Sequence, residues 1–205
     1  FALAYLGLFG YWEKSMSTMS LVAASALLCI IIGMPLGILC GKRPRTFAVV
    51  KPVLDFMQTM PSFVYLIPAV AFFSIGKPPG VFATVIFAMP PMIRLSALGV
   101  QQVPYDVKEA ALAFGASPLK LLLKVELPLA VPSLMAGANQ TIMMSWSMVI
   151  SASLIGAGGL GYDVLKALRL LNTGEGMLAG TAIVLCAMVL DRIVQGAADK
   201  RKTDR

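Results

Sequence analysis

The stretch VPYDVKEAALAFGASPLKLLLKVELP, residues 103–128, carries charged residues between two very apolar segments. Its first half is typical of a short helix, because Pro104 suits the first helical position and residues 105–114 include good helix formers. Gly115 stands where a helix often ends in a left-handed conformation. We therefore expect a first short helix that ends at Gly115.

The second half of this stretch predicts another short helix. Ser117 is a preferred N-cap and Pro118 a preferred first helical residue, so LKLLLKV is expected to be helical until Pro128. Two helices joined at Gly115 would form a bend, and residues 103–128 are called the elbow from here on. Another protein could approach the first helix closely on a side made of small residues, Ala110, Ala111 and Gly115.

The composition indicates an integral membrane protein. Of the 205 residues 58% are apolar and 13% are charged, whereas soluble proteins have about 25% charged residues. Apolar segments long enough to cross a bilayer predict a single all-α domain of at least five membrane helices. These segments lie at about 15–41, 56–75, 81–98, 127 up to the glycines of 156–161, and 177–197.

The connections between these segments are predicted as follows. Residues 42–51 are expected to form a basic loop, and the span at 56–75 is expected to be interrupted by Pro61 and Pro68. The glycines of 156–161 should break the helix before a short surface helix at 163–171. The ends are expected to be the tail of an earlier helix or an external segment at 1–14, and a cytoplasmic basic tail at 198–205.

The positive charges predict the orientation in the membrane. If the elbow is cytoplasmic, thirteen lysines and arginines lie inside and only Lys14, Lys77, Lys166 and Arg169 lie outside. This distribution follows the positive-inside rule and puts the elbow and the C-terminus in the cytoplasm. It also accounts for the net charge of +7 without a nucleic-acid partner.

Several kinds of chemistry are not expected. The chain has no histidine, and its three cysteines lie in apolar runs without metal-ligand spacing, which is typical of buried free thiols: Cys29, Cys40 and Cys186. The glycines of 156–161 follow an apolar membrane segment and not a strand, so they do not predict a dinucleotide site. We therefore expect no catalytic residue, metal or cofactor, and an intramembrane enzyme is a remote alternative.

The elbow also resembles a known family. The pattern Glu109-Ala110-Ala111, three residues, Gly115, nine residues, Val125, one residue, Leu127-Pro128 is similar to the EAA loop of the membrane subunits of bacterial ABC importers. In that pattern isoleucine stands where this chain has Val125. The phrases LDFMQTMPSFVYLIP, IFAMPPMIRLSALGVQQVP and MAGANQTIMMSWSMVISASLIGAGGLG resemble the permease subunits of glycine betaine/proline-type importers, and the likeness covers about residues 15–195.

The resemblance implies a type I importer bundle in a bacterial inner membrane. A symmetric pair of permeases would work with two ATP-binding subunits, and with an extracytoplasmic solute-binding protein or a fused binding domain. ATP hydrolysis would belong to the partner subunits, and the cargo would be a compatible solute such as glycine betaine, choline or proline betaine. Two alternatives stay open, namely an importer for another small polar solute and a passive channel.

The resemblance also implies the docking residues. Glu109 would make a charge contact with the ATPase subunit, in a groove that also receives Ala110, Ala111 and Gly115. The alternative is a solvated helix carboxylate beside Lys108.

Polar residues inside the spans are the candidates for the transport pathway. Such groups need partners in lipid, so they face either another helix or an aqueous route. The candidates are Gln58, Thr59, Asn139, Gln140 and Ser147. Trp146, with Tyr65 and Phe63, could offer aromatic faces to a quaternary ammonium, although packing is the alternative for each. Arg94 is expected to pair with the protein or with lipid phosphates.

Overall fold

The computed structural model describes residues 7 and 9–203, apart from the side chains of 194, 195 and 197–203. The described chain is mainly α-helical. The α-helices are α2 (Trp12–Lys42), α3 (Pro44–Thr59), α4 (Leu66–Phe73), α5 (Lys77–Gln101), α6 (Tyr105–Ala113), α7 (Pro118–Leu121), α8 (Leu127–Ser153), α9 (Leu160–Arg169) and α10 (Thr173–Thr203). A 3₁₀ turn at Ser62–Tyr65 lies between α3 and α4, and a π turn at Leu122–Glu126 lies between α7 and α8. Residues 1–6, part of the predicted tail of an earlier helix, lie outside the described chain.

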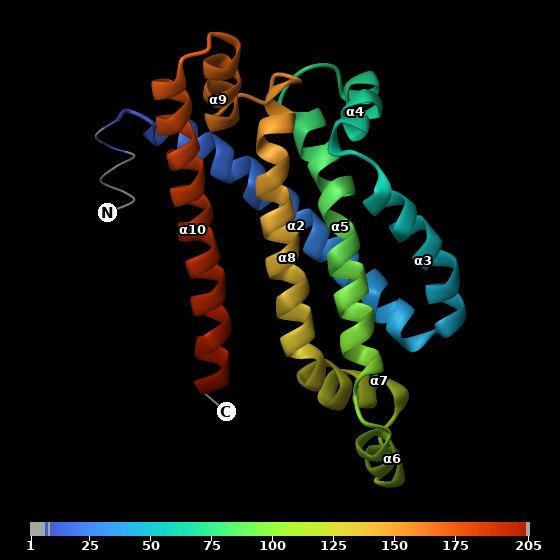
Figure 1. Cartoon of the computed structure of the whole chain (residues 1–205). Helices are drawn as coiled ribbons and strands as arrows, with labels where there is room; N and C mark the ends of the chain where they lie inside the picture. The colour runs from blue at the N-terminus through green and yellow to red at the C-terminus, as the bar shows by residue number, and fades with distance from the viewer. Residues whose placement is uncertain (1–6, 8, 204–205) are drawn as a thin grey trace.

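Helices α2, α5 and α8 form the centre of the bundle. α5 and α8 run antiparallel side by side, and α2 crosses behind them on a slant (Figure 1). α3 and α4 lie on the outer side of α5, and α10 lies beyond α8. The elbow extends past one end of the bundle, whereas α9 and the start of α10 lie at the other end.

Glycines let α2 approach α5 closely. A Cβ atom added at Gly37 would lie 2.5 Å from Cβ of Ser96 and 2.6 Å from the carbonyl oxygen of Ile93, and one at Gly41 would lie 2.8 Å from Cβ of Val100. Backbone contact of this kind is how small residues join membrane helices. The two helices therefore pack as one unit.

Gly37→Ala is expected to destabilise the bundle, because the new methyl group must push the backbones of α2 and α5 apart. Overpacking of this kind costs about 1–3 kcal/mol, so the thermal midpoint of the purified protein should fall. The control is Gly180→Ala in α10, where an added Cβ meets nothing within 4 Å and alanine is the better helix former. Equal midpoints for the two variants would contradict the close α2–α5 contact.

Four helical stretches are long and apolar enough to cross a membrane, with a fifth if the bent pair Pro44–Thr59 and Ser62–Phe73 counts as one span. The interruption predicted at Pro61 in the span at 56–75 is confirmed, since the pair is bent by 108°, although its first helix begins well before residue 56, at Pro44. The break falls at Met60, which is extended (φ −74°, ψ 134°), because the residue before a proline avoids the helical region. The interruption predicted at Pro68 is wrong, because this proline lies in the first turn of α4, where its missing N–H costs no helical hydrogen bond.

The predicted basic loop at 42–51 is also wrong over most of its length. Only Arg43 lies between α2 and α3, in an extended conformation, and Pro44 then begins α3. Proline at the first helical position fits this start, because its fixed φ suits a helix and its missing N–H costs no hydrogen bond there. Lys42 therefore ends α2 and Arg45 and Lys51 lie on α3, and of the four positive residues only Arg43 lies in a connection.

The break at the glycines of 156–161 is confirmed. α8 ends at Ser153, and Gly156, Gly158 and Gly159 have φ of 80°, 72° and 73°. The predicted short helix is α9, which begins slightly earlier than expected, and α10 follows after Asn172, whose side chain accepts a hydrogen bond from the Glu175 N–H at 3.3 Å. α10 continues to Thr203, so the predicted tail from 198 is helical as far as the structure describes it.

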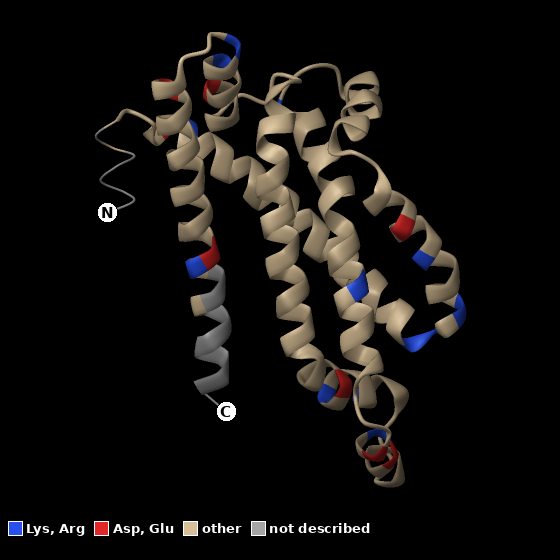
Figure 2. Cartoon of the chain, in the orientation of Figure 1, with Lys and Arg blue, Asp and Glu red and all other residues tan. Residues whose placement is uncertain are grey.

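The charged residues lie mainly towards the two ends of the bundle (Figure 2). Positive residues occur on α3, on α5 and in the elbow, and a second group lies around α9. The division matches the two groups of lysines and arginines expected from the sequence. Which group faces the cytoplasm stays a prediction.

Candidate partner-docking site and transport pathway

The bend of the elbow is formed as predicted at Gly115. α6 ends at Ala113, and Gly115 has φ of 77°. The Ala116 N–H donates to the Ala111 carbonyl at 3.1 Å and the Gly115 N–H to the Leu112 carbonyl at 2.9 Å, the hydrogen-bond pair of a Schellman motif. The end of α6 is thus set by its own backbone and not by burial.

The second arm begins as predicted but does not end at Pro128. Ser117 caps α7 by accepting a hydrogen bond from the Lys120 N–H at 3.4 Å, and the chain then continues through the π turn directly into α8. Pro128 has no N–H that could bond to a carbonyl of the preceding turn. That preceding turn is the π turn, in which the Leu127 N–H bonds to the Leu122 carbonyl. The second arm of the elbow therefore continues into the long helix α8 without a break, whereas the bend at Gly115 separates α6 from it.

The surface of α6 is largely exposed. None of its residues is buried, and Glu109 and Ala110 are exposed, while Ala111 is half-buried. Large apolar side chains surround them, with Phe114 94%, Tyr105 75% and Leu119 64% exposed. A patch of small and apolar residues around one carboxylate is typical of a surface that a protein partner covers.

Phe114 was missed as a candidate in the sequence. Its position directly before the helix-ending glycine was the available signal, because the left-handed turn at Gly115 directs the chain away and leaves this side chain without neighbours. It is the most exposed of the large apolar residues.

Gly115→Val is expected to disturb the elbow through the backbone. No atom lies within 4 Å of an added Cβ at this position, so the only penalty is the left-handed φ, which a β-branched residue tolerates poorly, at about 1–2 kcal/mol. We expect loss of transport with the membrane helices intact, measured as uptake together with the helical circular dichroism signal. Gly115→Asn is the matched control, because asparagine tolerates this conformation; equal transport by the two variants would contradict the prediction.

A buried carboxylate lies where the elbow meets the bundle. Glu126 is 4% exposed, and its two carboxylate oxygens pair with Nζ of Lys42 at 3.3 Å and of Lys108 at 3.6 Å. Nζ of Lys108 also donates to the Val100 carbonyl at 3.3 Å, at the end of α5. Lys108 therefore turns into the bundle and does not accompany Glu109, its neighbour in the sequence. We call Lys42, Lys108 and Glu126 the Glu126 cluster.

The pathway candidates on α8 are divided between two environments. Gln140 and Ser147 are exposed, Asn139 is half-buried, and the Ser147 hydroxyl donates to the Met143 carbonyl of its own helix at 3.1 Å. The two exposed polar residues belong to a continuous exposed stripe of α8, made of Leu129, Pro132, Ala136, Gln140, Met143, Ser147, Ile150 and Leu154. The described part of the chain leaves this α8 stripe uncovered.

Gln58 and Thr59 lie at the end of α3, away from the α8 stripe. Both are exposed, and the Thr59 hydroxyl donates to the Phe56 carbonyl at 2.9 Å. They are the last residues before the break at Met60, so they lie at the bend between α3 and α4.

The three aromatic candidates do not form one site. Tyr65 is buried against α5, where it packs edge-on against Phe87 at 6.1 Å between ring centroids and its hydroxyl donates to the Met57 carbonyl. Trp146 is 7% exposed and lies in a different core cluster, with Val22 and Ile142, whereas Phe63 is 57% exposed. Trp146 and Tyr65 therefore pack inside the bundle, which is the alternative considered for them.

One further polar contact connects helices. Arg94 of α5 pairs with Asp55 of α3, so the expectation that Arg94 pairs with the protein is confirmed.

The three cysteines are buried free thiols, as predicted.

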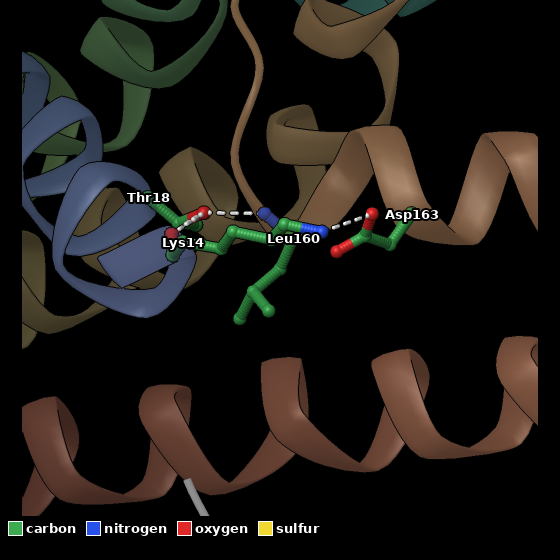
Figure 3. Close-up of polar contacts among 4 residues, drawn as sticks. All are labelled: Lys14, Thr18, Leu160 and Asp163. Carbon is green, nitrogen blue, oxygen red and sulfur yellow. Dashed lines mark hydrogen bonds and ion pairs between the residues drawn. The ribbon is translucent and has the colours of Figure 1, made fainter. Parts of the chain in front are cut away.

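At the end away from the elbow, α2 is bonded to the start of α9 (Figure 3). The Leu160 N–H donates to the Thr18 hydroxyl at 2.9 Å, that hydroxyl donates to the Lys14 carbonyl at 3.0 Å, and Nζ of Lys14 pairs with Asp163 at 2.8 Å. A Cβ atom at Gly159 would collide with the Thr18 hydroxyl. This connection was not predicted, because its members are 142 to 149 residues apart in the sequence.

The apolar helical bundle with its long apolar helices is that of a multi-pass membrane protein. The family model described as "Binding-protein-dependent transport system inner membrane component" matches residues 33–204, and the chain belongs to this family. The fold is that of type I ABC importer permeases: a chain of the inward-facing MetNI methionine ABC transporter superimposes with a TM-score of 0.76 at 23% identity, covering 90% of this chain and 91% of that one.

Curated relatives are similar over nearly the whole chain. The glycine betaine/proline betaine transport system permease protein ProW of Escherichia coli is 50% identical over 194 residues, 95% of this chain and 55% of the relative. The glycine betaine/carnitine transport permease protein GbuB of Listeria monocytogenes is 51% identical over 95% of this chain and 69% of the relative. The chain thus spans about half the length of ProW.

Proposed function

We propose that this chain is the permease subunit of an ATP-driven importer and forms the membrane pathway for a compatible solute such as glycine betaine or proline betaine. The observation that carries the proposal is α6, a helix with no buried residue that lies beyond one end of the bundle (Figure 1). Apart from the contact of Lys108 with the bundle, this helix contributes little to the packing of the chain, and a docked ATPase subunit would bury it. The printed functions of the relatives at about 50% identity support the solute class.

The proposed assembly contains two copies of the permease, two ATP-binding subunits and a solute-binding protein or fused binding domain. The uncovered α8 stripe supports the second copy, because Gln140 and Ser147 would then face an aqueous route between the two copies. The elbow and the C-terminus would face the cytoplasm, in agreement with the distribution of lysines and arginines.

Reconstitution tests this proposal against its alternatives. The permease, the ATPase subunit and the binding protein encoded with it are placed in proteoliposomes, and uptake of labelled glycine betaine, proline betaine, choline, carnitine and a small unrelated amino acid is measured. We expect uptake of one or more quaternary amines only when ATP is present on the side of the membrane that carries the ATPase subunits. Uptake without ATP would indicate a passive channel, and ATP-dependent uptake of the unrelated amino acid alone would indicate another small polar solute.

A further inference from the structure

The elbow needs a firm attachment to the bundle if it is to move the membrane helices. α6 buries no residue, so hydrophobic packing contributes little to its position. Near its first turn Val103 is 5% exposed, and on the second arm Leu121 is 9% exposed. Between these two contacts, the side chain that joins α6 itself to the bundle is Lys108.

Four segments meet at the Glu126 cluster. Lys42 is the last residue of α2, Glu126 is the last residue of the π turn before α8, and Lys108 lies in α6. The bond from Lys108 to the Val100 carbonyl adds the end of α5. One buried carboxylate is thus the common partner of the ends of α2 and α8 and of the elbow.

The helices that meet there are closely packed against one another. α2 is in backbone contact with α5 at Gly37 and Gly41, and a Cβ at Gly99 of α5 would lie 2.8 Å from Cβ of Ser133 in α8. Close-packed helices of this kind transmit displacement as a rigid body. α6 is the part that is not packed in this way.

We propose that Glu126 is the positioning residue that holds α6 on the closely packed unit of α2, α5 and α8, so that movement of docked ATPase subunits reaches the membrane helices. The inference rests on the proposed function for the identity of the docked partner. Glu126 itself touches neither ATP nor solute and acts through Lys108 and Lys42.

The chemistry of the cluster selects the variant for the test. Replacing a lysine would leave Glu126 buried without its full charge balance, which is strongly destabilising. Glu126→Gln instead leaves two lysines whose side chains are 31% and 23% exposed and can extend to water. Glu126→Gln should therefore fold and assemble while it loses both ion pairs, and Glu126→Asp keeps the charge within reach of both flexible lysines.

The first experiment measures coupling in the complete reconstituted complex. For Glu126→Gln we expect normal assembly and ATP hydrolysis, with solute transported per ATP hydrolysed reduced about fivefold or more. Glu126→Asp should restore most of this ratio. The control is Lys124→Met, which removes an exposed charge two residues away and should leave the ratio unchanged. A wild-type ratio in Glu126→Gln would overturn the proposal, and so would a fall in thermal midpoint with equal loss of hydrolysis and transport, because the role would then be structural.

The second experiment does not depend on transport. Spin labels on cysteines at Leu112 of α6 and Leu39 of α2, which are 51% and 42% exposed, report the distance between the elbow and α2 in the purified permease. We expect a narrow distribution in the wild type and in Glu126→Asp, and a broad one in Glu126→Gln. Identical distributions would refute the positioning role. Lack of transport by the wild type would instead count against the proposed function alone.

Discussion

Glu109→Lys is expected to abolish stable binding of the ATPase subunit while the permease still folds and inserts. Glu109 is exposed, and within the described chain it takes part in no ion pair. Reversing its charge therefore breaks nothing in the isolated subunit. At a docked interface the same change would place two like charges together away from water, which costs several kcal/mol.

The measurement is a binding titration between the solubilised permease and the ATPase subunit. A loss of about 2 kcal/mol or more weakens binding about 30-fold or more, and uptake should disappear with it. The matched control is Glu13→Lys, which makes the same charge change at an exposed residue in the first turn of α2, at the other end of that helix from the elbow. If Glu109→Lys and Glu13→Lys bind the ATPase equally well, Glu109 is not a docking residue.

The elbow was predictable because its signals are local. A glycine end and a serine cap each act within one turn, and the φ of Gly115 and the cap at Ser117 follow from them. Pro104 is the N-cap of α6, with ψ of 139°, and not its first helical residue as predicted, so the helix begins at Tyr105. The end expected at Pro128 was wrong because one π turn removes the need for the missing N–H. Whether a helix stops or adjusts at a proline depends on the packing of the rod that follows, and the sequence does not show that packing.

The Glu126 cluster could not be predicted for a different reason. Lys42, Lys108 and Glu126 belong to three separate segments of the sequence. Their pairing depends on the slant of α2 across the bundle (Figure 1), which lets Lys42 reach Glu126. The same holds for Thr18 and Leu160 at the other end. Long-range polar contacts of this kind depend on helix crossing, which periodicity along the chain does not determine.

The second large effect is expected at the α8 stripe, where single cysteines should react with a water-soluble thiol reagent if the stripe is wet and should not react if lipid covers it. The background lacks Cys29, Cys40 and Cys186, which are buried in any case. If the stripe lines an aqueous route between two copies, Gln140→Cys and Ser147→Cys should react with a small water-soluble thiol reagent, and Asn139→Cys, which is half-buried, should react more slowly. The rates should change when ATP is trapped, because the route would then open to the other side.

The structure decides which positions serve as controls. Val149 is 4% exposed and should stay unreactive in every state, whereas Met143 is 59% exposed and lies on the stripe between Gln140 and Ser147, so it belongs with the test positions. Ile31 of α2 is 66% exposed but apolar on a different helix, and a cysteine there should react only with a lipid-soluble reagent if it faces the bilayer.

These controls separate a route from a lipid-facing surface. A thiol must form its thiolate to react, and it does so only in contact with water. Labelling of Gln140→Cys, Met143→Cys and Ser147→Cys by the water-soluble reagent, with silence at Ile31→Cys, would therefore require water along the stripe. Silence at all three stripe positions with and without ATP would mean that lipid covers them, and the pathway would then have to be sought elsewhere, with Gln58 and Thr59 at the bend between α3 and α4 as the next positions to test.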